Sequence, residues 1–531
     1  MGGSLKARRM ACLLGCAAVG IVSGPAALAS VHPGNSAHPG NSRNSASPGN
    51  PGSAGAPPWT VYHDGPSGRG VATGIGSVDT SARAWTSPTL NGQLYGEPLV
   101  LGDLVYVATE NDAVYALSAA TGAIVWQVLL GTAVPAEALP CSNIGPNVGI
   151  TGTPVIDPAR HEIFVVADEV RDGKPAHILT GLNTSTGQVE LEQDVDPPHQ
   201  APAAQLQRTG LTLDEGRVYF GFGGNAEDCG SYHGRLVAVQ ETGGTPHFFS
   251  TTTGHGDNAG AIWMGGGAPS VGPNGDLWVE TGNSTADSTK GPYDDSDGVL
   301  DISPTLHLVQ YFAPAVWAVD NSDDLDMSAE PVLLPDGQVI AAGKSQVVYL
   351  LSGSHLGIGK QQAMLDNVCG SNIDGGSADD GMTVYLPCLS GIIAVRATSS
   401  PPTLRLLWTT NAGGGPPIVA GGLVWSVAQA GGLYGLDPAT GAIKQRAATG
   451  TVANHFPTPG VGAGLLLVPA AQTVIAFRTS ATGVGQGAGS PHISLAPGSH
   501  GGIVAEVVLG ALVGVGLIGW FIWLVRRTRR A

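Results

Sequence analysis

Short apolar runs alternate with polar turns along most of this chain. The clearest example is residues 115–126, which read Y-A-L-S-A-A-T-G-A-I-V-W and form two alternating arms joined at Thr121-Gly122. Alternation with a period of two predicts β-strands, and the glycine supplies the positive φ that a tight turn requires. A weaker copy at residues 434–445 reads Y-G-L-D-P-A-T-G-A-I-K-Q. Two copies of one hairpin so far apart indicate a repeat protein.

One strand of this pattern, apolar-x-Ala/Leu-apolar before a turn, recurs eight times at intervals of 41 to 65 residues. The eight copies lie at residues 114–117, 179–182, 236–239, 298–300, 348–351, 392–395, 433–436 and 474–477. Such an interval suits four short strands, which make one blade of a β-propeller. We therefore predict an all-β fold, an eight-bladed β-propeller over residues 59–482, with seven blades as the alternative.

The ring is predicted to close through its N-terminal strand. Residues 84–86 resemble the tryptophan end of the hairpin, whereas the last blade lacks such a strand after Phe477. A strand from the beginning of the chain would complete that blade and leave no exposed sheet edge.

The N-terminal region has the pattern of a targeting segment. Lys6, Arg8 and Arg9 precede an apolar run that ends at Ala27-Leu28-Ala29, which predicts a signal peptide over residues 1–29. A retained anchor is the alternative. Residues 30–58 are rich in Gly, Pro, Asn and Ser and are predicted to form a disordered linker.

The C-terminal region has the pattern of a membrane anchor. Residues 483–502 are predicted to be a flexible stalk, and residues 503–525 are apolar apart from Glu506. Such a run is long enough to cross a bilayer as a single transmembrane helix. Four arginines follow within residues 526–531, so this basic tail is expected in the cytoplasm and the propeller outside the cell.

Charge narrows the possible partners. The chain has a formal net charge of −17, and without the seven basic residues of the two ends it would be −24. So acidic a domain argues against nucleic acid and anionic lipid as partners. The expected partners are an unknown protein or small-molecule ligand, and the cell membrane through the C-terminal helix.

Four cysteines lie between the two ends, namely Cys141, Cys229, Cys369 and Cys388. An even number outside the cell suggests two disulfides, although spacing alone leaves the pairing open. We favour Cys369–Cys388, which closes a short loop, and Cys141–Cys229 by elimination.

Residues 116–126 resemble the tryptophan-docking repeat A-x-D-x-x-T-G-x-x-x-W of the pyrroloquinoline quinone (PQQ) propeller superfamily, with Ser118 in place of the aspartate. The second copy keeps Thr440-Gly441 but has Gln445 in place of the tryptophan. Residues 140–157, 229–234 and 278–283 look like parts of secreted, membrane-anchored actinobacterial members. The superfamily contains quinoprotein alcohol dehydrogenases as well as non-enzymatic scaffolds.

The resemblance to the dehydrogenases implies a site for PQQ and Ca²⁺. By motif, Trp263 corresponds to the floor under the quinone and Lys344 to the basic residue that bonds it. The metal ligands would be Glu227 and Asn283. The catalytic aspartate would be Asp323 or Asp324, within residues 321–326. Each residue also has a structural alternative, such as blade packing for the tryptophan, a turn for the asparagine, and a solvated surface position for the glutamate and lysine.

The chain departs from those enzymes in three respects. It has no adjacent cysteine pair, residues 321–326 read N-S-D-D-L-D instead of an H-D-E-W-D-like segment, and no C-x-x-C-H haem motif is present. The leading hypothesis is therefore a binding or scaffold module at the cell surface, anchored to the membrane. The alternative is a PQQ- and calcium-dependent alcohol or sugar dehydrogenase. Calcium bound only for stability, or a different ligand in a quinone-shaped pocket, also remain open.

Overall fold

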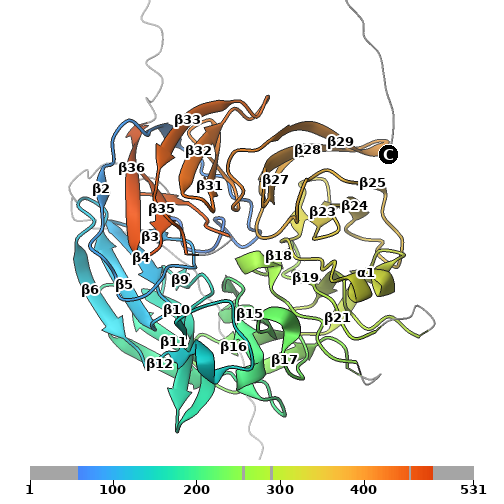
Figure 1. Ribbon diagram of the computed structural model, residues 1–531, viewed down its shortest axis with the longest axis horizontal. Helices are drawn as coiled ribbons and strands as arrows, with labels where there is room; N and C mark the ends of the chain where they lie inside the picture. Colours follow the sequence, from blue (N-terminus) through green and yellow to red (C-terminus); the bar gives the residue numbers. More distant parts are fainter. Residues whose placement is uncertain (1–57, 254–256, 287–290, 454–455, 482–531) are drawn as a thin grey trace, which may run out of the picture. The chain divides into compact units, whose positions relative to one another are not determined.

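A computed structural model describes residues 58–253, 257–286, 291–453 and 456–481 of the chain. All of them belong to one compact unit. Within these ranges the chain forms antiparallel sheets of four or five strands, which lie around a common centre as eight blades (Figure 1). The predicted all-β, eight-bladed propeller is confirmed, and the seven-bladed alternative is wrong.

The first four blades follow one another along the chain. Blade 1 holds β3 (Leu99–Leu101), β4 (Leu104–Ala108), β5 (Ala113–Ser118) and β6 (Ile124–Leu129); blade 2 holds β9 (Val155–Asp157), β10 (Glu162–Arg171), β11 (Lys174–Asn183) and β12 (Val189–Asp194); blade 3 holds β13 (Gln205–Gln207), β14 (Thr212–Asp214), β15 (Arg217–Gly224), β16 (Arg235–Gln240) and β17 (His247–Ser250); blade 4 holds β18 (Ser270–Val271), β19 (Leu277–Thr281), β20 (Gly298–Ile302) and β21 (Leu308–Phe312).

The other four blades complete the ring. Blade 5 holds β22 (Val332–Leu333), β23 (Gln338–Ala342), β24 (Val348–Ser352) and β25 (Ala363–Leu365); blade 6 holds β26 (Ala378–Asp380), β27 (Thr383–Cys388), β28 (Gly391–Ser399) and β29 (Pro402–Thr410); blade 7 holds β30 (Ile418–Ala420), β31 (Leu423–Ala428), β32 (Gly432–Leu436) and β33 (Ile443–Ala448); blade 8 holds β34 (Gly460–Gly462), β35 (Leu465–Ala470), β36 (Thr473–Ala481), β1 (Ile75–Asp79) and β2 (Trp85–Thr86).

The strand pattern read from the sequence corresponds to the third strand of every blade. These third strands are apolar and buried along most of their length, as in β5, whereas an outer strand such as β6 alternates between exposed and half-buried positions. A single blade cannot bury both of its faces, so neighbouring blades pack face to face. The core is therefore distributed between the blades.

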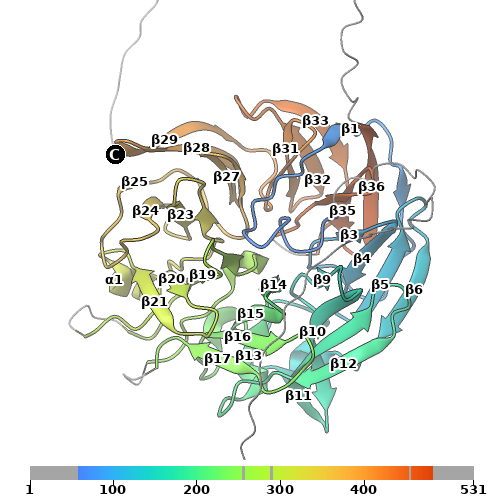
Figure 2. The same ribbon diagram turned by 180° about the vertical axis from the view of Figure 1, so that it is seen from behind.

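The chain closes the ring as the sequence predicts. β1 and β2 both pair antiparallel with β36, with Trp85 opposite Ala476. The first strands of the chain thereby complete the last blade and cover its edge. Figure 2 shows the segment that precedes β1 running across the middle of the ring.

Tryptophans dock three of the blades on the turn of the next. The Trp126 indole of blade 1 donates a 2.9 Å hydrogen bond from Nε1 to the Thr184 carbonyl of blade 2. A methyl group placed on Gly187 in that turn would lie 2.8 Å from the same ring, so only glycine fits there. Trp85 and Trp408 dock in the same way on the turns of blades 1 and 7.

In blade 7, the side-chain amide of Gln445 takes the place of the docking tryptophan. Gln445 of blade 7 donates from Nε2 to the Val78 carbonyl of blade 8 at 2.7 Å. Its Oε1 accepts from the Thr80 backbone amide and hydroxyl. The packing contact has been exchanged for three hydrogen bonds to the closing strand.

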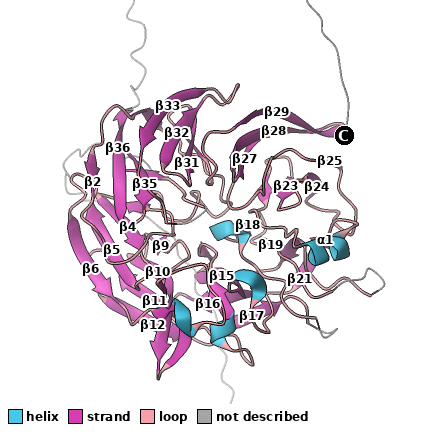
Figure 3. Cartoon of the chain, viewed as in Figure 1, coloured by secondary structure: helices cyan, strands magenta, loops and turns pink. Residues whose placement is uncertain are grey.

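In the part of the chain that the structure describes, helical structure is confined to short segments between strands (Figure 3). These are η1 (Ala136–Ala138), η2 (Pro202–Ala204), η3 (Ala226–Asp228), η4 (Met264–Gly266) and α1 (Trp317–Asp323), and a small hairpin joins β7 (Val134–Pro135) to β8 (Asn147–Val148). Within the described ranges, none of these helices is long and apolar enough to cross a membrane. The signal peptide, linker, stalk and transmembrane helix that the sequence predicts all lie outside those ranges.

Both predicted disulfides are present. Cys141 is bonded to Cys229, and Cys369 to Cys388. The first joins the loop of the β7–β8 hairpin to the residue that follows η3. The second joins Cys369, in the loop before β26, to Cys388 at the end of β27.

Candidate functional site

The candidate residues lie in loops at one end of the blades. Asn283 and Lys344 follow the second strands β19 and β23, and Trp263 and Asp326 lie in the loops that lead into β18 and β22. Antiparallel strands alternate in direction, so both kinds of loop open at the same end of the ring. Residues far apart in sequence are thereby brought together.

Asp326 is the centre of this group. It is fully buried, and its Oδ1 accepts a 2.6 Å hydrogen bond from the Asn283 backbone amide. Its Oδ2 lies 2.5 Å from Nζ of Lys344. Burial raises the pKa of Asp326, while the Lys344 ammonium and the Asn283 amide oppose the rise. The result is a carboxylate held in one position by a backbone donor and a cation.

Lys344 joins a buried and an exposed carboxylate. Besides Asp326, its Nζ lies 3.0 Å from Oδ1 of Asp324, whose side chain is 69% exposed. Burial acts against the charge of the lysine, but the two carboxylates hold the pKa of Lys344 above its ordinary value. The ammonium group is therefore both charged and fixed in place.

Asn283 carries an unused acceptor beside two carboxylates. Its Oδ1 is buried and has no hydrogen-bond partner among the described residues. Its side chain lies near Asp228 and opposes the rise in the pKa of that carboxyl, whose Oδ1 accepts from the Tyr232 hydroxyl at 2.5 Å. Burial raises the pKa of Asp228, and the negative charge of Asp326 adds to the rise. Amide and carboxylate oxygens of this kind are the donors that hard cations prefer.

Trp263 belongs to the same loops. Its half-buried indole packs against Tyr232 and Ala261, and Nε1 donates a 3.0 Å hydrogen bond to the Gly224 carbonyl at the end of β15. The backbone connects it to the asparagine loop, because the Gly282 amide donates to the Ala261 carbonyl at 2.8 Å. The Trp263 loop is thus joined to the Asn283 loop through the backbone.

The structure brings some of the sequence candidates together and leaves others apart. Asn283 and Lys344 both contact Asp326, and Asp324 joins them through its ion pair with Lys344. Trp263 is connected to them only through the backbone of its loop. Asp323 is exposed in the last turn of α1 and makes no hydrogen bond or ion pair with any described residue. For Glu227 only the backbone is described, within η3.

Sequence reasoning missed Asp326 and Asp228. Asp326 is the last acidic residue before the buried stretch that starts at Met327, and this change from acidic to apolar is a signal that could have singled it out. Asp228 directly follows Glu227, so the same loop motif contains it.

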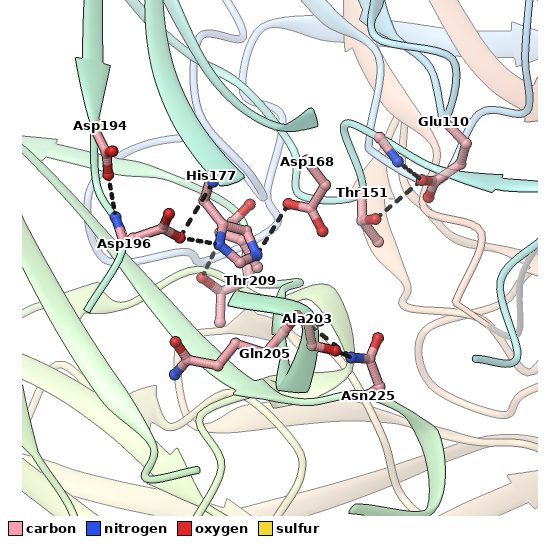
Figure 4. A network of polar contacts seen from close by, with 12 residues as sticks. Glu110, Thr151, Asp168, His177, Asp194, Asp196, Ala203, Gln205, Thr209 and Asn225 are labelled. Carbon is pink, nitrogen blue, oxygen red and sulfur yellow. Dashed lines mark hydrogen bonds and ion pairs between the residues drawn. The ribbon is translucent and has the colours of Figure 1, made fainter. Parts of the chain in front are cut away.

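A second buried polar network lies in blades 1 to 3 (Figure 4). Nδ1 of His177 lies 2.6 Å from Asp196, and its Nε2 lies 3.4 Å from Asp168. Burial alone would lower the pKa of His177, but these carboxylates raise it to about 10. In blade 3, Asn225 donates to the Ala203 carbonyl at 2.9 Å and so holds the loop that begins η3.

In the described ranges, acidic, histidine and cysteine side chains alone do not form a metal site. Across the described part of the chain, no three or more His, Cys, Asp or Glu side chains are grouped so that they could hold a metal ion. A cation in the candidate site would therefore need the Asn283 amide oxygen, and further oxygens from a bound ligand, to complete its coordination.

Comparisons with known proteins agree with this fold. Residues 75–259 match a family of PQQ repeats described as "Outer membrane protein assembly factor BamB". A polyvinylalcohol dehydrogenase of Sphingopyxis sp. (strain 113P3) is 25% identical over 339 residues, which are 55% of this chain and 48% of the relative. The match thus spans about half the length of that relative.

Solved structures give the same result. A quinohemoprotein alcohol dehydrogenase of Pseudomonas putida HK5 has a TM-score of 0.60 at 13% identity, and one of Comamonas testosteroni has 0.59 at 14%; each match covers 80% of both chains. A europium-containing methanol dehydrogenase has a TM-score of 0.57 at 15% identity, over 77% of this chain and 89% of the other. At these identities the likeness is one of fold. The chain is therefore an eight-bladed β-propeller that matches a family of PQQ repeats over residues 75–259 and shares the fold of the quinoprotein alcohol dehydrogenases.

Proposed function

We propose that the protein is a PQQ-dependent alcohol dehydrogenase, with its quinone and a hard cation bound among Trp263, Asn283, Asp326 and Lys344. The observation that carries this proposal is the buried Asp326 carboxylate, held between the Asn283 amide and the Lys344 ammonium at 2.6 and 2.5 Å. Buried, oriented carboxylates with raised pKa values are typical of active sites.

The residues present fit a quinone and a cation. The unpaired Oδ1 of Asn283 lies beside Asp228 and Asp326, which suits an oxygen-binding cation. Calcium and a lanthanide both belong to this class, and one protein of the same fold contains europium. Trp263 offers a flat apolar ring for a planar cofactor.

Each residue has a distinct role in the proposed reaction. Asp326 accepts the hydroxyl proton of the alcohol as the general base, and burial, which raises its pKa, favours this uptake. Lys344 balances the negative charge of Asp326 while that carboxyl group is ionised. The backbone amide of Asn283 holds the carboxylate in position. The quinone, when bound, supplies the acceptor for the hydride of the alcohol carbon.

The dehydrogenase hypothesis replaces the scaffold hypothesis as the leading one. The relative and the structural neighbours that are named as dehydrogenases support it more than a purely structural role. They also suggest alcohols as the substrate class, with polyvinyl alcohol as the first substrate to test. Two disulfides support a location outside the cell, and the anchor at residues 503–525 remains part of the proposal.

The test is to titrate the purified full chain with PQQ in the presence of Ca²⁺ or Eu³⁺. Tryptophan fluorescence reports binding, and dye-linked oxidation of ethanol and polyvinyl alcohol reports turnover. We expect Asp326→Asn to bind the quinone but to lose about 10²–10⁴-fold in turnover. Asp323→Asn, at an exposed neighbouring position, should retain the activity of the unaltered protein.

A second variant tests the cofactor-binding residue. Trp263→Ala should weaken quinone-dependent quenching without unfolding the propeller. An absence of binding at micromolar PQQ with either metal would rule out the dehydrogenase and restore the scaffold hypothesis.

A further inference from the structure

A pocket of about 470 Å³ opens between blades 6 and 7, which are neighbours in the ring (Figure 1). Strands β26 to β29 form one wall, and the turn between β32 and β33 of blade 7 forms the other. The turns that border the pocket lie at the opposite end of the ring from Asp326, because successive strands of a blade alternate in direction. Pockets for small ligands measure about 300–1000 Å³, so this one has room for a small molecule.

Four polar side chains that line the pocket form one row across blade 6. Asp380 of β26 lies opposite Thr383 of β27, which in turn lies opposite Arg396 of β28. Arg396 lies opposite Arg405 of β29. Directly opposed residues point to the same face of a sheet, with their Cβ atoms about 4.5–5.5 Å apart. This is the face toward blade 7, because Tyr385, two residues after Thr383, belongs to the core between those blades. Two guanidinium groups therefore extend from neighbouring strands into one space.

This arginine pair has no partner in the part of the chain that the structure describes. Arg396 and Arg405 make no hydrogen bond or ion pair with any described residue. Both side chains are exposed, so their donors are open to a ligand. Like charges directly opposite each other on a sheet repel and destabilise it. An anion between the two guanidinium groups would remove this repulsion.

The nearby carboxylates do not neutralise the pair. Asp380 stands two strands from Arg396, which is about 10 Å at the usual strand spacing. Asp437, in the turn of blade 7, lies 3.3 Å from Lys444 and accepts from backbone amides of the same turn. The two arginines and Lys444 therefore leave one positive charge in excess here, although the whole chain has a formal net charge of −17.

Two hydroxyl-bearing side chains line the same pocket. Neither Tyr385 nor Thr383 uses its hydroxyl in a hydrogen bond with a described residue, so both are free to donate to a ligand. Burial raises the pKa of Tyr385 to about 12, which keeps its hydroxyl protonated. The Tyr385 ring lies 5.8 Å from the Trp408 ring, whose Nε1 donates to the Pro438 carbonyl of blade 7 at 2.9 Å. The contact that docks blade 6 on blade 7 thus holds this donor in place.

We propose that this pocket binds a phosphate monoester, with the Arg396 and Arg405 guanidinium groups holding the phosphate oxygens. A phosphate monoester carries a charge of about −1.5 to −2 at pH 7, which matches two arginines. Each guanidinium offers a fork of donors that fits two oxygens of a phosphate. The remaining space suits the organic group that carries the phosphate. The pocket is remote from Asp326, so the inference does not rest on the proposed dehydrogenase activity.

The experiment uses the full chain, with glycerol 3-phosphate as the probe. Binding is measured at constant ionic strength by calorimetry and by the rise in Tm, with glycerol and inorganic phosphate as comparison ligands. We expect saturable binding of glycerol 3-phosphate that weakens at least about tenfold in Arg405→Gln, since this variant loses a charged fork to the phosphate. Arg478→Gln, at an exposed position on β36, should bind the probe like the unaltered chain. Glycerol should not bind, and inorganic phosphate should bind more weakly than the ester.

The stability of the unliganded variants separates loss of the site from loss of the fold. Without phosphate, Arg405→Gln should melt at the same temperature as the unaltered chain or higher, because its repulsion with Arg396 is gone. Saturating glycerol 3-phosphate should raise the Tm of the unaltered chain and leave that of the variant unchanged. Arg396→Lys keeps the charge but not the fork, so it should bind with intermediate affinity.

Two results would overturn the proposal. Equal Tm shifts in the unaltered chain and in Arg405→Gln, or an equal effect of chloride, would show that the arginine pair is not a phosphate site. Equal affinities for inorganic phosphate and for glycerol 3-phosphate would show that the pocket does not recognise an ester.

Discussion

The backbone amide of Asn283 donates a 2.6 Å hydrogen bond to Oδ1 of Asp326, 43 residues further along the chain. This bond joins the loop after β19 in blade 4 to the loop before β22 in blade 5. The side chain at residue 282 is absent because a Cβ on Gly282 would lie 2.9 Å from the same oxygen. The buried carboxylate of Asp326 is thus held in position where blades 4 and 5 meet.

The first prediction concerns the ion pair of Lys344 and Asp326. Lys344→Met leaves a fully buried carboxylate without its cation, which should lower the free energy of unfolding by about 3–5 kcal/mol at pH 7. The loss should shrink at pH 5, because a protonated Asp326 no longer needs the cation. Urea unfolding at the two pH values measures both effects.

Asp324→Asn is the control for that pair. Its side chain is 69% exposed, so removal of its charge should change stability by less than about 1 kcal/mol. Equal losses in the two variants would mean that the buried pair is no more important than the surface pair.

The second prediction concerns blade docking at Trp126. Gly187→Ala places a methyl group 2.8 Å from the indole, in addition to the strain of its positive φ of 73°. Gly173→Ala has the same backbone strain at φ 75°, but nothing lies within 4 Å of the new methyl group. We expect Gly187→Ala to be less stable than Gly173→Ala by about 1–3 kcal/mol. Chemical denaturation of both variants measures the difference, and equal stability would show that the ring does not need this contact.

The third prediction concerns the amide that replaces a tryptophan. Gln445→Ala removes three hydrogen bonds to Val78 and Thr80, and should cost about 1–3 kcal/mol of stability at the closing blade. Gln127→Ala, on the exposed face of β6, should change stability by about 0.5 kcal/mol or less. Limited proteolysis should also release the N-terminal strands earlier in Gln445→Ala. Similar behaviour of the two variants would contradict a role for Gln445 in ring closure.

The fourth prediction concerns pH. Burial and neighbouring carboxylates raise the pKa of Asp112 to about 9, and burial raises that of Glu110 to about 8. In the unfolded chain both groups titrate near pH 4. Between these values the folded protein holds protons that the unfolded chain has released, so the free energy of unfolding falls as pH rises from about 4 to 8. Each group contributes up to about 1.4 kcal/mol per pH unit.

Asp112→Asn isolates one of these groups. Both oxygens of Asp112 are buried without a hydrogen-bond partner in the described part of the chain, so an uncharged amide should be tolerated. Relative to the unaltered protein, the variant should gain stability as pH rises from 5 to 8. Comparing the two chains at each pH cancels the contribution of His177, which also falls as pH rises. A difference that does not depend on pH would show that Asp112 has an ordinary pKa.

Local motifs predict several residues of the candidate site, but they do not predict which acidic residue is buried in it. Trp263, Asn283 and Lys344 each follow a recognisable turn or strand, and the structure brings Asn283 and Lys344 together at Asp326, with the Trp263 loop bonded to the Asn283 loop. Within residues 321–326 the acidic side chains look alike in the sequence, yet Asp323 is exposed at the end of α1 whereas Asp326 is fully buried. Local pattern does not distinguish them, because burial depends on where the chain runs after the helix.

The sequence by itself determined the architecture of this protein. Alternating strands, glycine turns and tryptophan-docking positions act over a few residues, so the eight third strands and the closing strand at Trp85 could be read directly. Only the tertiary structure decided which polar groups meet, such as Asp326 with Lys344. These are contacts between blades that are distant in sequence, and their chemistry arises from burial and charge that no single segment contains.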